Sequence, residues 1–128
     1  MPFIWISVGA VPGAIARYLI GRLMAGWLGT AFPYGTFVVN TAGCLIVGAV
    51  GTMVTARLID HADVVRLVVI VGFLGSLTTF SSFAYETHSL LSDGAWVRAL
   101  LNIVLSVLAG LAGVRIGVLL TPRLGGML

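Results

Sequence analysis

A run of small and hydroxyl-bearing residues is the segment of this sequence best suited to chemistry. Gly72 and Gly75 are followed by five serine or threonine residues within the seven positions 76–82. Hydroxyl side chains can bond to backbone carbonyls and so compete with the helical hydrogen bonds. Inside a membrane, irregular backbone is tolerated only where protein or a water-filled cavity covers it. We therefore predict a broken helix here, whose freed carbonyl oxygens could coordinate a hard monovalent cation.

From Thr79 onward, hydroxyl groups and aromatic rings lie on neighbouring strips of one helix. Thr79, Ser82 and Glu86 have the spacing i, i+3, i+7 and so share a face, and Phe80 and Phe83 form an i, i+3 pair beside them. Hydroxyl groups donate hydrogen bonds, and the rim of an aromatic ring is electropositive. Together they could replace the water shell of a small anion. The alternative is that the rings are ordinary core and that the hydroxyls bond to their own helix.

Other polar side chains lie within apolar stretches and invite similar interpretations. Asn40 either donates to an anion or bonds to a neighbouring helix, and the i, i+4 pair Asn102 and Ser106 has the same two alternatives. Arg17 is predicted to be structural, bonded to carbonyls or to Glu86, although its charge could also attract anions.

Catalytic chemistry is not indicated by any motif in the sequence. Glu86 is the only acid well inside an apolar stretch, and no nucleophile motif, phosphate loop or metal-ligand cluster accompanies it. His61 lies in a polar segment and is predicted to be solvated. We therefore predict that the protein is not an enzyme.

The composition indicates that lipid surrounds these residues. Of the 128 residues, 59% are hydrophobic and 9% are charged, whereas an ordinary soluble domain is about one quarter charged. All the basic residues are arginines, scattered singly in or beside apolar runs. This scatter argues against a nucleic-acid partner and favours a lipid bilayer.

The positioning elements are predicted to be four membrane-spanning helices within a single transmembrane domain, residues 1–128. Each apolar stretch is long enough to cross a bilayer, which takes about 20 residues. Because the connections between them are short, an up-down-up-down, all-α bundle is expected. The predicted helices cover approximately residues 3–28, 35–56, 64–91 and 95–120.

Small residues and charges suggest how these helices assemble. The pairs Gly9/Gly13 and Gly113/Gly117 are small-xxx-small motifs, which allow close helix packing in lipid. Arginines are nearly balanced between the two predicted sides of the membrane, so the positive-inside rule sets no clear orientation. Oppositely inserted copies could then pair; the alternative is one orientation set by a dominant charge. The compared sets are Arg57, Arg66, Arg115 and Arg123 against Arg17, Arg22 and Arg98.

These residues resemble the Fluc family of fluoride channels, also called CrcB proteins. The resemblance is carried by residues 35–40, by 72–83 together with Glu86, and by the Gly-Ala-x-x-Arg motif ending at Arg17. It extends over essentially the whole chain. It implies an antiparallel, dual-topology homodimer in the bacterial inner membrane. Two separate pores in such a dimer would export cytoplasmic fluoride passively and electrogenically, giving resistance to fluoride toxicity.

The resemblance also implies roles for individual residues. A structural sodium ion, which is not transported, would be held at the dimer interface by the carbonyls of Gly75 and Thr78 from both subunits. The sequence departs from the family at Ser76, where a second glycine is frequent, and at Asn102, where a bulkier polar residue is expected. The implied ion-pathway residues are Asn40, Thr79, Phe80, Ser82, Phe83, Asn102 and Ser106.

Two other functions compete with a channel. A small multidrug-type, proton-coupled exporter would need a membrane-embedded carboxylate in its first helix, but this first stretch carries Arg17 and no acid. A non-transporting membrane assembly subunit is the second alternative.

Overall fold

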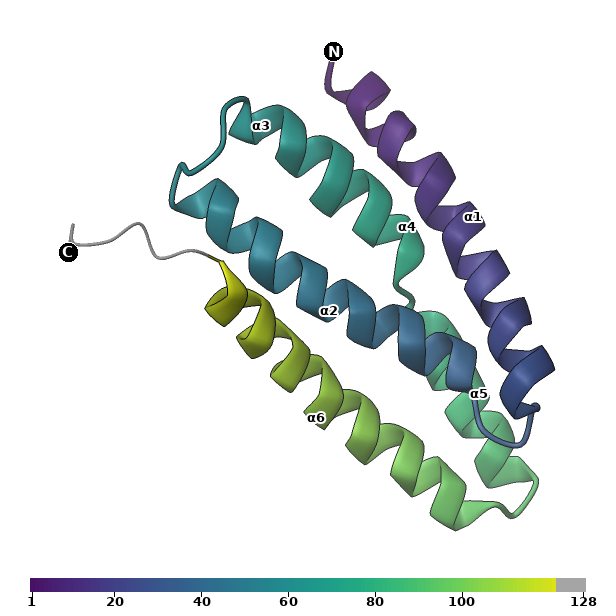
Figure 1. The fold of residues 1–128 in the computed structure, drawn as a ribbon. Coiled ribbons are helices and arrows are strands. Elements are labelled where there is room, and N and C mark those ends of the chain that lie inside the picture. The colour runs from purple at the N-terminus through teal and green to yellow at the C-terminus, as the bar shows by residue number, and fades with distance from the viewer. Residues whose placement is uncertain (122–128) are drawn as a thin grey trace.

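The computed structural model describes residues 1–121, which form four helical spans of alternating direction (Figure 1). Pro122 and Arg123, which entered the predictions of the last helix end and of the charge balance, lie outside the described residues. The third span is divided into several segments. In chain order the elements are α1 (Pro2–Leu28), α2 (Tyr34–Thr55), α3 (Ala62–Val65), η1 (Arg66–Leu74), α4 (Gly75–Leu77), α5 (Phe80–Ser92) and α6 (Trp96–Leu120).

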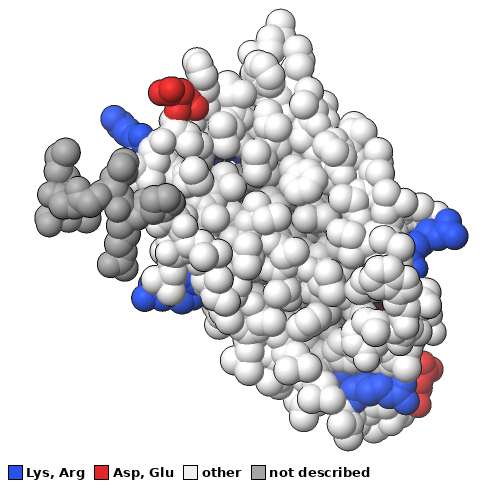
Figure 2. Space-filling view, viewed as in Figure 1, with Lys and Arg blue, Asp and Glu red and all other residues white. Residues whose placement is uncertain are grey.

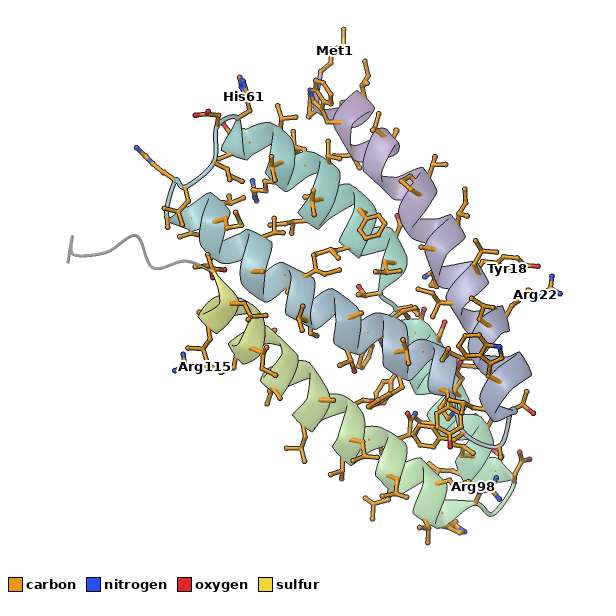
Figure 3. The ribbon with its side chains drawn as sticks, in the orientation of Figure 1. Met1, Tyr18, Arg22, His61, Arg98 and Arg115 are labelled. Atoms are coloured by element: carbon orange, nitrogen blue, oxygen red, sulfur yellow. The ribbon has the colours of Figure 1, made fainter. Side chains whose placement is uncertain are left out.

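All four spans are long and apolar enough to cross a membrane, with mean hydropathies from 1.6 to 2.3. Even the shortest, α2 with 22 residues, is about 33 Å long at the usual helical rise, which matches the hydrocarbon core of a bilayer. On the face shown in Figure 2, the blue and red charged groups lie towards the edges and leave a broad uncharged surface between them. His61 and Arg98 mark opposite ends of the bundle (Figure 3). The prediction of an all-α protein with four membrane-spanning helices is confirmed.

Glycine allows the tight turns between spans. Gly29, after α1, has φ 77°, and Gly94, before α6, has φ 72°. Positive φ angles are adopted most readily by glycine, because a Cβ atom would crowd the backbone. The chain can therefore reverse direction within a few residues at this end of the bundle.

Helices pack closely where glycines remove side chains from the contact. A Cβ atom added to Gly72 of η1 would lie 3.0 Å from the Cα atom of Gly9 in α1. One added to Gly113 of α6 would lie 3.2 Å from the carbonyl oxygen of Thr41 in α2. The neighbouring glycines of both predicted pairs, Gly13 and Gly117, also meet backbone atoms of a partner helix. The predicted role of these motifs in close packing is confirmed.

The third span departs from regular α-helix in two places. Arg66–Leu74 is a π-helix of nine residues, a feature that the sequence did not predict. After α4 the backbone is extended at Thr78 (φ −83°, ψ 154°) and at Thr79 (φ −152°, ψ 116°), and helix resumes at Phe80. This pair falls near the middle of the 31 residues from Ala62 to Ser92. Figure 1 shows the ribbon changing course between α4 and α5.

Candidate ion pathway

A groove of about 480 Å³ opens beside the extended pair. It collects residues from α2, α4, α5 and α6, together with η1 and the extended pair itself. Ser82 and Asn102 were also predicted for the pathway but do not line the groove. The predicted residues that do line it are Asn40, Gly75, Thr78, Thr79, Phe80, Phe83 and Ser106, and none of the lining residues is charged.

The side chain of Asn40 joins α2 to the extended backbone. Its Nδ2 donates to the carbonyl oxygen of Thr79 at 3.0 Å, and its Oδ1 accepts from the N–H of Thr79 at 2.7 Å. Asn40 therefore makes the bond to a neighbouring span that was one of its two interpretations. An amide nitrogen carries two N–H groups, so the bond to Thr79 leaves one for another acceptor.

Thr79 caps the helix that follows it. Its Oγ1 accepts from the backbone N–H of Ser82 at 3.1 Å and donates to the hydroxyl of Ser82 at the same distance. A threonine before the first helical turn is favoured because its oxygen satisfies an N–H that has no helical acceptor. The cap starts α5 at Phe80 and places the hydroxyls of Thr79 and Ser82 side by side.

Phe80 and Phe83 lie together on the groove. Their ring centroids are 5.6 Å apart and the ring planes are tilted by 43°. Phe80 is 79% exposed in the single chain, so it is not part of the core of that chain. The alternative that both rings are ordinary core is wrong for Phe80.

Asn102 lies behind the groove rather than on it. The side chain is 1% exposed, and its Nδ2 donates to the hydroxyl of Thr87 at 2.9 Å. Ser106, which does line the groove, donates to Asn102 Oδ1 at 3.4 Å. Thr87 in turn donates to the carbonyl oxygen of Phe83 at 2.7 Å. A polar chain thus runs from the groove into the bundle, and the sequence interpretation missed Thr87 as a member of it.

Glu86 has a different partner from the one expected. The hydroxyl of Thr36 in α2 donates to Glu86 Oε1 at 2.8 Å, whereas Oε2 is buried and has no partner within residues 1–121. In the same range Arg17 makes neither a hydrogen bond nor an ion pair. The expected bond from Arg17 to Glu86 or to carbonyls is therefore wrong. Thr36 was missed because the sequence does not reveal which helix faces Glu86.

Comparison with known families identifies the chain. Residues 4–118 match the family model described as "CrcB-like protein, Camphor Resistance (CrcB)". The protein belongs to the CrcB-like family. This match covers nearly all of the four spans, including α2, the extended pair and the groove. The family suggested by residues 35–40 and 72–83 is thereby confirmed.

Curated relatives of this CrcB-like chain carry the name "Fluoride-specific ion channel FluC". The protein of Chloroflexus aurantiacus is 48% identical over 121 residues, which cover 94% of this chain and 95% of the relative. The protein of Solibacter usitatus is 42% identical over 123 residues, covering 96% and 100%. That of Coxiella burnetii is 39% identical over 124 residues, covering 97% and 100%. With its four apolar spans, this chain is a multi-pass bacterial membrane protein.

The buried pair behind the groove of this CrcB-like protein can be tested by removing one partner at a time. Thr87→Val takes away the acceptor of Asn102 and should lower the free energy of unfolding by about 1–3 kcal/mol, since a buried donor loses its partner. Asn102→Leu in the same chain removes the orphaned donor and should recover part of the loss. Thermal unfolding in detergent measures both. Equal stability of wild type and Thr87→Val would show that the pair contributes nothing.

Proposed function

We propose that this chain forms a fluoride-selective channel that releases cytoplasmic fluoride passively and electrogenically, and so protects the cell from fluoride toxicity. The observation that carries the proposal is the groove beside the extended pair, which places hydroxyls and the Phe80 and Phe83 rings together near mid-span without a charged lining residue. The names of the relatives agree with fluoride as the ion.

The mechanism addresses the dehydration of a small anion. Donors along the groove would replace water: the remaining N–H of Asn40 and the electropositive rims of Phe80 and Phe83. The hydroxyls of Thr79 and Ser106 would join them by turning their O–H groups from Ser82 and Asn102 towards the anion. A fixed cation would bind the anion too tightly to let it leave, whereas several weaker donors permit passage. No energy source is required, because an inside-negative potential drives an anion outward by about 2.3 kcal/mol per 100 mV.

We further propose that the functional unit is an antiparallel, dual-topology homodimer in which the groove of each copy faces the other. The nearly even distribution of arginines supports insertion in both orientations. The open groove supports a partner at this face, because the polar residues Asn40, Thr79 and Ser106 that line it would otherwise meet lipid. In this assembly the third span acts as a broken helix, with Thr78 and Thr79 as the break.

A structural sodium ion at the dimer interface completes the proposal. Carbonyl oxygens of unwound helices are suitable ligands for sodium. The Gly75 and Thr78 carbonyls fit this role, because the N–H groups that would cover them in a continuous helix bond elsewhere. The ion would join carbonyls of both copies and would not be transported.

Ion release from liposomes tests the function directly. Purified protein should release fluoride with a compensating electrical current when potassium and valinomycin clamp the potential, and should leave chloride inside. Replacing sodium with choline on both sides should reduce the fluoride release. Proton-coupled export of an organic cation without fluoride release would favour a small multidrug-type exporter. Release of neither would favour a non-transporting assembly subunit.

A further inference from the structure

Two carbonyls in the third span lose their helical donors to side chains. In an α-helix the N–H of residue i bonds to the carbonyl of residue i−4. In a continuous helix the N–H of Thr79 would therefore bond to the carbonyl oxygen of Gly75, and the N–H of Ser82 would bond to that of Thr78. Instead, the Thr79 N–H bonds to Asn40 Oδ1 at 2.7 Å, and the Ser82 N–H bonds to Thr79 Oγ1 at 3.1 Å.

Helix α2 contacts both residues of the extended pair from one face. Asn40 holds Thr79 by both its N–H and its carbonyl oxygen. One turn further along α2, Gly43 leaves room for the Thr78 side chain, since a Cβ atom there would collide with Thr78 Cγ2. The extended conformation is thus imposed from a neighbouring span as well as by the local hydroxyl of Thr79.

We propose that Asn40 and Thr79 are positioning residues for a carbonyl cation site: each captures an N–H group that would otherwise cover a carbonyl of Gly75 or Thr78. The proposal rests on the proposed function, which places sodium at those carbonyls. It explains why the two carbonyl oxygens have no helical N–H donor and can bind a cation. Asn40 acts on the cation site through Thr79 and does not itself touch the ion.

The hydrogen bonds by which Asn40 holds Thr79 and Thr79 holds the Ser82 N–H, together called the clamp, link the cation site to the anion groove. Asn40 and Thr79 belong to the clamp and also line the groove. If the clamp opens, Thr79 can return to helix, and the carbonyls are covered as the groove changes shape. Loss of the clamp should therefore weaken sodium binding and fluoride release together.

Asn40 variants separate the two hydrogen bonds that Asn40 contributes to the clamp. Asn40→Leu has a similar volume and removes both bonds, whereas Asn40→Asp keeps the oxygen that accepts from Thr79 N–H. The readout is the sodium concentration needed to raise the unfolding temperature of the purified protein in detergent, at constant ionic strength with choline. We expect Asn40→Leu to raise this concentration at least about tenfold, or about 1.4 kcal/mol. Asn40→Asp should need no more sodium than the wild type.

Thr79 variants provide a second test if Asn40→Leu does not fold. Thr79→Val removes the oxygen that captures the Ser82 N–H and should also raise the required sodium concentration. Thr79→Ser retains the oxygen and should restore the wild-type response. Amide hydrogen exchange gives an independent readout. The exchange rate of the Ser82 backbone N–H should differ from that of the wild type in Thr79→Val, and should equal it in Thr79→Ser. Asn102→Leu is the matched control, because it removes a buried asparagine that does not contact the extended pair.

The outcomes distinguish the clamp from the function on which it rests. A wild-type protein that sodium does not stabilise would refute the sodium site itself, and absence of fluoride release would refute the channel. If sodium stabilises the wild type and both Asn40→Leu and Thr79→Val respond equally well, the clamp is refuted while the site survives. An Asn102→Leu protein that loses the sodium response would also overturn the assignment, because any buried polar loss would then have the same effect.

Discussion

Replacing Phe80 with isoleucine should slow fluoride release from liposomes by at least about tenfold, equivalent to a barrier increase of about 1.4 kcal/mol. The aromatic rim offers positive electrostatic potential to an anion that has lost part of its water shell, and an aliphatic side chain of similar bulk offers none. Phe83→Ile should act in the same direction, because the two rings are adjacent on the groove. The measurement is the initial rate of fluoride release under a clamped potential.

Phe3→Ile is a matched control for this experiment. Phe3 is 79% exposed, as is Phe80, but it lies at the start of α1 and does not line the groove. Both variants should unfold at nearly the wild-type temperature. If Phe80→Ile releases fluoride as fast as Phe3→Ile, the ring has no part in conduction.

The largest effect on stability is expected for Gly9→Ala. The added Cβ atom would collide with the carbonyl oxygen of Val68 and lie 2.8 Å from the backbone nitrogen of Phe73, both in η1. Because backbone atoms cannot rotate away as a side chain can, α1 and η1 must separate. We expect a loss of about 2–3 kcal/mol in the free energy of unfolding, measured by thermal or detergent-induced unfolding.

Gly26→Ala is the control in the same helix. Apart from the adjoining backbone of α1, no atom of residues 1–121 lies within 4 Å of the position that its Cβ would occupy, and alanine favours helix over glycine by about 0.5–1 kcal/mol. This variant should be as stable as the wild type or slightly more stable. Equal losses in Gly9→Ala and Gly26→Ala would mean that close contact with η1 is not what glycine provides at position 9.

The positions of the four spans, and the irregular backbone within the hydroxyl-rich residues 76–82, were predictable because both depend on local sequence. Length and hydropathy alone identify a membrane helix, and serine and threonine compete with helical hydrogen bonds wherever they cluster. The π-helix of Arg66–Leu74 was not predictable, because its sequence is an ordinary apolar run. Its conformation accompanies the close glycine contact with α1, which the sequence does not place opposite it.

The partners of the polar residues were the least predictable part of the site. Asn40 and Thr79 are 39 positions apart, and Thr36 and Glu86 are 50 apart. Such pairings depend on which helix faces which, and periodicity within one helix does not determine that. The error over Arg17 has the same origin: an arginine and a glutamate were paired by charge alone, whereas a threonine from α2 bonds to Glu86.

The π-helix also determines the direction in which the later residues of the third span point. Each residue of an α-helix advances by about 100° around the axis, and the wider turns of a π-helix advance by less. Over the nine residues of η1 this lag accumulates. The direction around the helix axis in which Thr79 faces Asn40 is therefore determined by η1, whose only polar side chain is that of Arg66.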